Sequence, residues 1–532
     1  METADVIVIG GGISGLSCAL KLLEENKSLR VKVLEASGRL GGRTQTIRTE
    51  TGNYVDLGGQ WLSPQHTRMI RLCERFGIQT HQQYYDEGQH VIASTGDGSR
   101  KTYKGEIPPH SILSLVELQF KALWQVNGLS RTLVSKYDKV KAGTATAAEE
   151  AEVARYDTTT VAAWAEKTMW TKAAKDTMNV AVLSIFGLEA SQVSLLEYVW
   201  YTKQNGGVEH LIGTTGQAQD RSLVGGTAQV SDRLAGEFER LGGEVKREHQ
   251  VTGLTAELNG GGSPQVTLIA ECGRGDGKTG SAVEFKCRTV VVAVCPLVLI
   301  DMIQKGGAGV SPPLPHSLSV AAHRAFRGSY GKAFTQWSRP FWREKGFSGF
   351  GVDSRVSSEH LVGFFYDACH KQEGENGESR EWYGLTGFLV GDVAVEATGL
   401  TLEERKRRVL NSVKYFFGET DAELLDYQEK IWSQDEFARG CPVSLAPPGC
   451  FTKFGVDRLF REPLKVGMKG KTLSFSDPGE SSQRTGGVEG PEVLFWASTE
   501  TADEWCGYME GAVGAGERAA GQVLRVLGGG AA

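Results

Sequence analysis

Three glycines near the start of the chain have the spacing of a nucleotide-binding turn. Gly10, Gly12 and Gly15 form a G-x-G-x-x-G pattern that follows the apolar run "VIVI" and opens a stretch with helical spacing. In this pattern the first glycine permits a tight turn, the second lets backbone approach a pyrophosphate, and the third lets the helix pack on the strand. Glu35 ends the next apolar run, where a carboxylate can accept a hydrogen bond from a ribose hydroxyl. The glycines alone are a weak signal, but with the strand, the helix and Glu35 they predict dinucleotide binding.

A second glycine-rich turn follows directly in "EASGRLGGRTQT". It can close on the same pyrophosphate, and Arg43 can neutralise the phosphate charge; the alternative is a surface loop with a solvated arginine. The stretch "YVDLGGQWLS" then adds Gly58 and Gly59. This glycine pair is useful where backbone must approach a flat ring.

Cys441 has an unusual setting for a structural thiol. It lies between Gly440 and Pro442 in "EFARGCPVSLAPPG", whereas a buried thiol is more often found inside an apolar strand or helix. A thiolate is a soft nucleophile, so a cysteine in such a turn can react. The alternative is a passive thiol beside a binding site.

The elements around these residues predict an α/β protein with a discontinuous nucleotide-binding domain. A strand, a helix and a second strand are expected over 5–36, and further strands over 289–294 and in "EVLFWAS", the last followed by a long helix. Helical patterns dominate 108–220. The expected domains are therefore a dinucleotide-binding domain of residues 1–90, 221–300 and 465–532, and a mixed α+β substrate domain of residues 91–220 and 301–464.

Composition excludes several classes of function. The 532 residues carry a net charge of −6 and no basic field stands out, which argues against nucleic acid as a partner. Nine cysteines are scattered without CxxC pairs, and the histidines have no ligand spacing, so neither a disulfide framework nor a metal site is expected. We also expect no targeting segment, no membrane span, no membrane partner and a soluble, intracellular chain, cytoplasmic in the first instance.

The sequence resembles the flavin-dependent amine oxidase superfamily, closest to the monoamine oxidases, as a soluble member. The resemblance extends from end to end and is carried by these stretches: "VIVIGGGISGL", "VLEASGRLGGRT", "YVDLGGQWLSPQHTRM", "LEYVWYTKQNGG", "LVGGTAQVSDRLA", "GSYGKAFTQWSRPFW", "YQEKIWSQDEFARGC" and "FWASTETADEWCGYMEGAVGAGERAA". It implies the two-domain FAD-dependent amine oxidase fold, with a Rossmann-like FAD domain built from discontinuous segments. It also implies FAD as the cofactor, an amine and O2 as the substrates, and a homodimer.

By the same resemblance, FAD contacts would fall on Gly10, Gly12, Gly15, Glu35, Arg43, Gly58, Gly59, Val251, Thr499, Glu500 and Met509. Glu500, like Glu510, could equally be an ordinary acid at a helix start. Cys441 matches the family's cysteine that forms a thioether with the flavin 8α-methyl group, and Trp432 precedes it as in the family. The turn Ala438-Arg439-Gly440 departs from the family's run of small residues, and other branches of the family hold FAD without a bond.

The resemblance also implies the catalytic residues. Lys332 in "GSYGKAF" matches the lysine near flavin N5 that assists the reaction with O2; the alternative is a strand lysine facing solvent. Tyr508 matches one wall of an aromatic cage, but Pro442 stands where the second aromatic wall is usual. Three further residues would line the substrate cavity: Tyr201, Ile212 and Gln219. Ile212 could instead be core, and nearby Glu209 could either meet a cationic amine or be solvated.

The expected activity is oxidative deamination of a primary amine by transfer of a hydride equivalent to flavin N5. The carbonyl product, ammonia and hydrogen peroxide would be released. The alternative is a polyamine, diamine (putrescine-type) or L-amino-acid oxidase of the same superfamily. A flavin-bearing scaffold is disfavoured by Lys332, Tyr508 and Cys441, and a nicotinamide dehydrogenase by the lack of a second dinucleotide pattern.

Overall fold

The chain divides into two compact units, and each is built from separate segments. Unit 1 comprises Met1–Arg43, Ala228–Phe326 and Val443–Ala532, and unit 2 comprises Thr44–Thr227 and Arg327–Pro442. The computed structural model describes residues 1–93, 100–105, 108–273, 281–305, 309–353, 359–373, 379–455, 459–469, 472–478 and 488–528.

The borders of the units differ from those expected from the sequence. Residues 44–90 lie in unit 2, whereas residues 301–326 and 443–464 lie in unit 1. Compactness alone does not say which segment binds a ligand. The assignment of FAD binding to residues 1–90, 221–300 and 465–532, and of substrate binding to the rest, therefore stays a prediction.

The centre of unit 1 is a sheet of seven strands that is mostly parallel. Its order is β11-β3-β2-β15-β27-β25-β26, in which β25 is antiparallel to both of its neighbours, β27 and β26. The strands are Glu244–Lys246, Val31–Leu34, Val6–Ile9, Thr289–Val292, Glu492–Trp496, Leu464–Lys469 and Thr472–Phe475. β2 and β15 are buried along their whole length, which is why they read as unbroken apolar runs. The strands predicted near residues 5, 31, 289 and 492 are confirmed.

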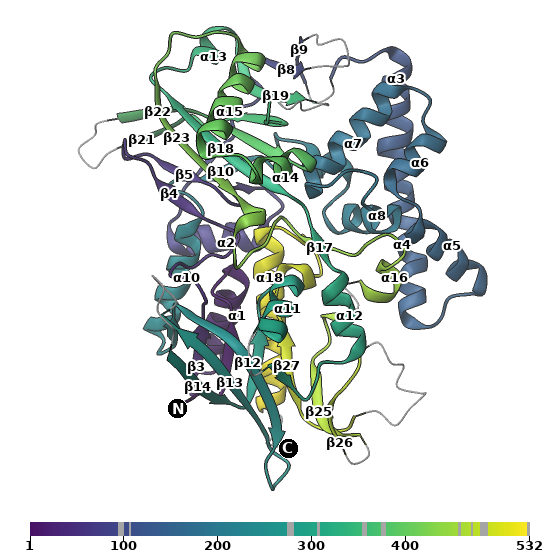
Figure 1. The fold of residues 1–532 in the computed structure, drawn as a ribbon, viewed down its shortest axis with the longest axis vertical. Helices are drawn as coiled ribbons and strands as arrows, with labels where there is room; N and C mark the ends of the chain where they lie inside the picture. The colour runs from purple at the N-terminus through teal and green to yellow at the C-terminus, as the bar shows by residue number, and fades with distance from the viewer. Residues whose placement is uncertain are drawn as a thin grey trace. The chain divides into compact units, whose positions relative to one another are not determined.

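The two ends of the chain meet in unit 1. Helix α1 (Ile13–Glu25) packs against α18 (Met509–Gly528), and Figure 1 shows the purple and yellow segments side by side. The contact is so close that a Cβ on Gly516 would lie 2.3 Å from the carbonyl oxygen of Ser14. Small residues in α18 therefore let the first and last helices share one layer on the sheet.

A second sheet and several helices complete unit 1. The sheet order is β1-β14-β13-β12-β16, with strands Glu2–Thr3, Ser281–Cys287, Pro264–Cys272, His249–Leu258 and Gly309–Ser311. The remaining elements are α10 Ala228–Arg240, α11 Pro296–Lys305, α12 His316–Arg324, α16 Phe451–Phe454, η3 Thr499–Thr501 and the short strand β24 Ser444–Leu445. Side chains of both sheets share one apolar core.

Unit 2 contains a larger mixed sheet. The path is β23-β18-β22-β20-β19-β8-β9, with β21 paired to β22. These strands are Leu424–Ile431, Tyr330–Trp337, Ser379–Val390, Phe364–Asp367, Phe347–Asp353, Gln89–Ala93, Arg100–Tyr103 and His370–Glu373. Aromatic side chains of α15 (Leu402–Phe417) pack into its core, and the short elements α13 (Phe341–Glu344), α14 (Asp392–Thr398) and η2 (Trp432–Gln434) flank it.

The helical region predicted over 108–220 is confirmed in unit 2. It comprises α3 Ile112–Glu117, the π-helical η1 Leu118–Gln125, α4 Val126–Ala142, α5 Ala147–Thr158, α6 Val161–Thr168, α7 Lys172–Phe186, α8 Leu195–Gln204 and α9 Val208–Ile212. Around it lie α2 Thr67–Phe76, the pair β4 Thr46–Arg48 and β5 Tyr54–Asp56, and a small sheet of β6 Trp61–Leu62, β10 Arg221–Leu223 and β7 Thr80–Gln82. β17 (Phe326–Arg327) lies where unit 1 ends and unit 2 resumes. Within the described residues, no helix combines the length and the apolar composition that a membrane crossing requires.

Candidate active site

The glycine motif of unit 1 forms a tight strand–turn–helix connection. Gly10 has a φ of +107°, a conformation that side chains with a Cβ rarely adopt. A Cβ on Gly15 would lie 2.0 Å from the carbonyl oxygen of Gly10, so only glycine allows this contact. A Cβ on Gly12 would meet only the carbonyl oxygen of Gly41, at 3.9 Å. The second glycine of the motif thus borders open space, as an approach to a ligand requires.

The second glycine turn lies against the first. The amide of Gly41 donates to the carbonyl oxygen of Gly11 at 2.9 Å, and Gly12 and Gly41 form a bridge with parallel geometry. The glycine turn at Gly11 and Gly12 and the second turn at Gly41 are therefore in direct backbone contact. This arrangement is suited to enclosing a diphosphate from two sides.

The N-terminus of α1 keeps its capacity for an anion. Gly12 is the N-cap, makes no side-chain capping bond, and no acidic residue lies in the first turn. The Ser14 hydroxyl, in that same turn, is buried and has no hydrogen-bond partner in the described structure. Free amides and a positive helix end attract phosphate, and a buried hydroxyl without a partner indicates a missing polar ligand.

Glu35 is fixed by backbone and side-chain donors at the end of β3. Its Oε2 accepts from the Gly11 amide at 2.7 Å, and its Oε1 accepts from the Ser37 amide and hydroxyl, each at 2.8 Å. A carboxylate has about four acceptor positions, so capacity remains for a further hydroxyl donor. The carboxylate is therefore held in place for the ribose contact predicted from the sequence.

Arg43 and Glu500 form a two-pronged ion pair. The two guanidinium nitrogens donate to the two carboxylate oxygens at 2.9 and 3.0 Å, and the Glu500 side chain has no exposed surface. The alternative of a solvated loop arginine is therefore wrong. Glu500 does lie in the first turn of η3, as its alternative had it, but its carboxylate is buried against Arg43. Glu510 does lie in the first turn of α18, but it is buried. The charge of Arg43 is thus balanced largely by Glu500, a partner that spacing could not reveal.

The turn before α18 is closed by Thr499. Its hydroxyl accepts from the Gly507 amide at 3.0 Å and donates to the Tyr508 carbonyl oxygen at 3.0 Å. The Tyr508 ring packs edge-on against Trp505, with centroids 5.8 Å apart, and burial raises the pKa of its phenol. Met509 and, on β12, Val251 are both buried. The turn therefore holds the backbone of Tyr508, and burial keeps the phenol neutral.

In unit 2, Lys332 is a buried cation surrounded by oxygens. Its Nζ donates to the carbonyl oxygens of Asp56 at 2.7 Å and Gly58 at 2.9 Å, and also to Gln60 Oε1. The side chain is buried within β18, so the alternative of a lysine facing solvent is wrong. Gly59 is fixed too, because its carbonyl oxygen accepts from the Thr227 hydroxyl at 2.8 Å. Gly58 and Gly59 thus lie in the loop that Lys332 holds.

The surroundings of Lys332 shift its protonation. Burial lowers the pKa of the ammonium from the ordinary 10.5 to about 8, although Asp56 and Cys441 act in the opposite direction. The ammonium also lies 5.2 Å from the ring centre of Phe388 and 5.7 Å from that of Trp61. Burial likewise raises the pKa of the Asp56 carboxyl, while hydrogen bonds from Thr46 and Thr227 oppose the shift. The ammonium group of Lys332 therefore loses its proton at a pH only slightly above neutrality.

Cys441 belongs to the same unit and lies in a firmly held turn. Its amide donates to the Gly328 carbonyl oxygen at 3.3 Å, and the preceding Gly440 amide donates to Trp432 at 2.8 Å. Trp432 in turn donates from its indole to the Leu57 carbonyl oxygen at 2.7 Å. Cys441 acts to raise the pKa of Lys332, so the two residues lie within electrostatic range of each other in unit 2.

Two further residues hold the turn of Cys441 in place. The guanidinium of Arg327 donates to the carbonyl oxygens of Ala438 and Gly440, the latter at 3.1 Å. A Cβ on Gly328 would lie 1.6 Å from the Phe186 carbonyl oxygen, so this glycine is required for the close approach. Sequence reasoning missed both residues, because they precede Cys441 by more than a hundred positions.

The residues predicted for the substrate cavity differ in how deeply they are buried. Tyr201 is buried on α8, with its ring centre 4.8 Å from that of Phe186. Ile212 is 42% exposed, so its alternative as core is wrong. Gln219 donates to the Leu211 carbonyl oxygen at 3.2 Å, while its buried Oε1 has no partner in the described structure. Pro442 is partly exposed. Gln219 therefore has an acceptor available for a ligand.

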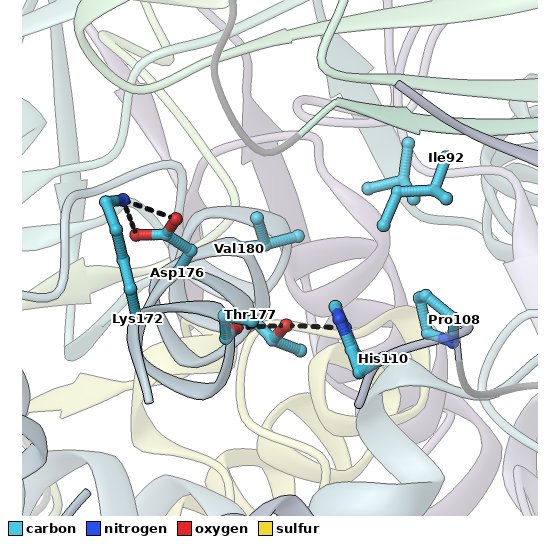
Figure 2. Close-up of a pocket in the computed structure, with 9 residues that line it drawn as sticks. Ile92, Pro108, His110, Lys172, Asp176, Thr177 and Val180 are labelled. Atoms are coloured by element: carbon cyan, nitrogen blue, oxygen red, sulfur yellow. Dashed lines mark hydrogen bonds and ion pairs between the residues drawn. The ribbon is translucent and has the colours of Figure 1, made fainter. Parts of the chain in front are cut away.

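A pocket of about 250 Å³ also opens in unit 2, at α7 and the strand ends beside it. Figure 2 shows the Lys172–Asp176 ion pair and a hydrogen bond between His110 and Thr177 in its wall. The other lining residues are apolar: Ile92, Pro108, Ala173, Val180 and Val352. Sequence reasoning missed this pocket, because its lining comes from four separate stretches. Among the described side chains, no group of His, Cys, Asp and Glu could hold a metal ion.

Three comparisons place these features among known proteins. Residues 13–524 match the family model described as flavin containing amine oxidoreductase. The flavin-containing amine oxidase of Oncorhynchus mykiss is 33% identical and covers 99% of this chain and 87% of its own length. Flavin-containing amine oxidase B of Homo sapiens is 30% identical, covering 98% and 86%. The solved structure of cyclohexylamine oxidase from Brevibacterium oxydans IH-35A is 26% identical, with a TM-score of 0.77 over 99% of both chains.

Proposed function

Because the chain belongs to the family of flavin-containing amine oxidoreductases, we propose that it oxidatively deaminates a primary amine with O2. The membership confirms the resemblance, the two-domain α/β flavoprotein fold and amine oxidation that were expected from the sequence. The identity of the amine and the role of each residue are proposals. The observation that carries them is the buried Lys332, whose ammonium lies among the carbonyl oxygens of Asp56 and Gly58.

The residues of unit 1 fit the diphosphate and ribose of FAD. The uncapped end of α1 and the open space at Gly12 suit the diphosphate, and the unpartnered Ser14 hydroxyl offers a further bond to it. Gly10 and Gly15 hold the turn in shape, and Glu35 would accept from the ribose. When bound, FAD would accept a hydride equivalent from the amine α-carbon and give its electrons to O2 as hydrogen peroxide.

The remaining assignments to FAD rest on the resemblance and on burial. Val251 would meet the adenine through its backbone, and Met509 would lie at the start of α18 near the ring. Thr499 would position this turn, since its hydroxyl already bonds both Gly507 and Tyr508. Arg43 would meet the diphosphate while Glu500 balances its charge, so the pair would add little net field of its own.

Lys332 would act on the oxygen half of the reaction. A fixed cation that is shielded from water stabilises the negative charge that develops as O2 is reduced, and it needs no rearrangement to do so. Its contacts to Asp56, Gly58 and Gln60 would keep the ammonium in one position. With a pKa of about 8, the ammonium is charged at neutral pH.

Tyr508 and the cavity residues would act in the half-reaction in which the amine is oxidised. The neutral phenol of Tyr508 offers an aromatic wall, while Pro442 leaves space where the family usually has the second wall. Tyr201 and Ile212 would supply apolar surface, which favours the neutral amine over the ammonium. Gln219 could accept from the amine nitrogen through its unpartnered Oε1.

Charged groups near these residues favour a monoamine over a diamine or an amino acid. Glu209 is exposed and accepts from the Asn127 amide at 2.8 Å, and Asp220 accepts from Arg221 at 2.7 Å. The Glu209 carboxylate is exposed to solvent and the charge of Asp220 is balanced by Arg221, so neither supplies an unbalanced buried charge for a second ammonium group. A diamine or polyamine oxidase would require such a partner in the cavity.

We further propose a thioether between Cys441 and the 8α carbon of the flavin. The turn of Cys441 is anchored by Trp432 and Arg327, which supports a fixed thiol rather than a mobile one. The homodimer and the cytoplasmic location stay predictions from the resemblance. Light scattering of the purified chain and cell fractionation would test them.

The test of the substrate class is hydrogen peroxide release from a panel of amines in air. The panel extends from benzylamine and tyramine through hexylamine and longer alkylamines to putrescine, spermidine and leucine. We expect turnover of the primary monoamines, with a preference for bulky or long ones because Pro442 leaves the cage open. Turnover of putrescine, spermidine or leucine alone would overturn the monoamine assignment and leave the oxidase assignment intact.

A further inference from the structure

Three consecutive carbonyl oxygens at the end of β5 accept hydrogen bonds from two buried side chains. Those of Asp56 and Gly58 accept from the Lys332 ammonium at 2.7 and 2.9 Å. The Leu57 carbonyl oxygen, which lies between them in the chain, accepts from the Trp432 indole at 2.7 Å. The lysine from β18 and the indole from η2 therefore hold the same short loop.

The Trp432 ring is in turn contacted by a second lysine, Lys430. Its ammonium lies 4.5 Å from the ring centre and donates to Asp435 Oδ2 at 2.7 Å. The side chains of Lys430 and Asp435 are only 19% and 13% exposed. A cation over an indole face is stabilised by the ring, and more strongly where water is largely excluded. Lys430 therefore joins Trp432 and Asp435 to each other.

Asp435 extends this contact into the turn that ends at Cys441. Its Oδ1 accepts from the backbone amides of Phe437 at 3.1 Å and Ala438 at 2.8 Å. Its carbonyl oxygen accepts from the Arg439 amide at 2.8 Å. One carboxylate oxygen of Asp435 thus binds the lysine, while the other fixes the backbone of the turn.

Lys430 occupies a position where a positive charge is unfavourable by itself. In the register of β18 and β23 it lies directly opposite the buried Lys332. Like charges at such a cross-strand pair destabilise a sheet, and an apolar side chain of similar length would avoid the repulsion. The charge of Lys430 is therefore explained by its contacts to Trp432 and Asp435 and not by the stability of the sheet.

We propose that Lys430 is a positioning residue for the formation of the flavin thioether at Cys441. This role rests on the thioether proposed above. Lys430 acts through Asp435, which shapes the turn of the cysteine, and through Trp432, which ties this turn to the loop held by Lys332. The same cation thus fixes the thiol relative to the loop in which Gly58 and Gly59 are expected to approach the ring.

Formation of the bond depends on where the sulfur is held. The Cys441 thiol and the 8α methyl group each give up one hydrogen, and a bond forms between the sulfur and the 8α carbon. The two electrons and two protons pass to the flavin, and then to O2 as hydrogen peroxide. A displacement of a reacting atom by about 1 Å can cost roughly a hundredfold in rate, so a residue that fixes the turn controls this step.

The test compares covalent flavin with total flavin in the purified full chain. Acid precipitation separates the two, and the mass of the denatured chain shows the added FAD. In Lys430→Met the total flavin should stay near the native level, whereas the rate at which covalent flavin appears during incubation with FAD in air should fall at least about tenfold. Lys430→Arg keeps the cation and should restore most of this rate, which a residue that merely fills space would not do.

The matched control is Lys406→Met. The Lys406 ammonium also lies over an aromatic ring, 5.8 Å from the ring centre of Tyr427, but outside the turn of Cys441. This variant should attach flavin as the native chain does. Flavin absorbance and thermal melting of every variant check that it is folded.

A second variant keeps the proposal testable if Lys430→Met does not fold. Asp435→Asn retains the shape of the side chain and removes the charge that binds Lys430, so it should slow attachment in the same way. Because the two residues act as one unit, the double variant Lys430→Met/Asp435→Asn should be no slower than the slower single variant. Effects that add would overturn the proposal.

The remaining outcomes separate this role from the proposals on which it rests. Native attachment in Lys430→Met, or no recovery in Lys430→Arg, would overturn the positioning role alone. A native chain that oxidises amines but releases all its flavin in acid would overturn the thioether and this role together, and leave the oxidase assignment intact. Covalent flavin that depends on Lys430 in a chain without amine turnover would support this role and overturn the proposed function.

Discussion

Lys332 illustrates how a single residue can be given a function by the atoms around it. A lysine on a strand is an ordinary surface residue, but here the ammonium is buried among the oxygens of Asp56, Gly58 and Gln60. Such a cation has lost most of its hydration and interacts strongly with any charge that forms beside it. Removing it should therefore affect the one step in which negative charge develops on oxygen.

The first prediction concerns Lys332→Met. Reduction of the flavin by amine should proceed near the native rate, whereas its reoxidation by O2 should slow by roughly a hundredfold. Stopped-flow absorbance measures the two half-reactions separately. Lys371→Met, an exposed strand lysine of the same unit, is the control and should change neither rate. Equal slowing of both half-reactions would contradict the assignment to oxygen.

The second prediction is the pH dependence of reoxidation. Burial lowers the pKa of Lys332 to about 8, so the ammonium is charged below that pH and neutral above it. Reoxidation should therefore decline above pH 8, and Lys332→Met should remove this dependence. The same shift affects stability: the buried charge costs free energy of folding below pH 8, and the cost fades as pH rises from 8 toward the ordinary 10.5. A reoxidation rate that is flat across this range would contradict the pKa assignment.

The third prediction concerns Cys441→Ala. Acid precipitation should leave the yellow colour with the protein in the native chain and release it to the supernatant in the variant. Cys450→Ala is the matched control, because this cysteine lies in the same stretch of sequence and should leave the attachment intact. A yellow supernatant from the native chain would show that the flavin is held without a bond.

At the scale of elements, different glycines of the first turn serve folding and ligand binding. A Cβ on Gly15 would collide with the backbone of Gly10, whereas a Cβ on Gly12 would point into space left for a ligand. Gly12→Ala should therefore give a folded chain with little flavin, and Gly15→Ala a chain that folds poorly. Absorbance of the flavin and thermal melting would measure the two effects.

A matched control exists in a helix of the same unit. A Cβ on Gly236, within α10, would meet no atom within 4 Å. Gly236→Ala should retain the flavin and raise the free energy of unfolding by about 0.5–1 kcal/mol, because alanine favours helix. Native flavin content in Gly12→Ala would mean that the diphosphate does not approach this turn.

The elements also show what the sequence could predict. The run "DVIVIG" and the helix after it were predictable, because a buried parallel strand is apolar throughout and the glycine spacing follows from the turn. The pairing of Arg43 with Glu500, and of Lys332 with the loop at Gly58, was not predictable from spacing. Each joins positions hundreds of residues apart, which only the tertiary fold brings together.

At the scale of the whole molecule, the chain passes between its two units several times. Unit 1 needs the first 43 residues, a middle segment and the last segment, so its sheet cannot form until the chain is complete. The compact units meet along the chain at residues 43, 227, 326 and 442, whereas the borders expected from the sequence followed local patterns of helix, strand and glycine. A sequence pattern predicts local helices and strands. It does not predict which distant segments pack together into one compact unit.

The most direct test of the whole account is one anaerobic and aerobic cycle with a primary monoamine. The amine should bleach the flavin absorbance without O2, and admitting air should restore it with release of one equivalent of hydrogen peroxide per flavin, as well as ammonia and the carbonyl product. That result would establish a flavin amine oxidase with O2 as its electron acceptor. A flavin that stays oxidised with every primary monoamine of the panel would contradict the proposed function.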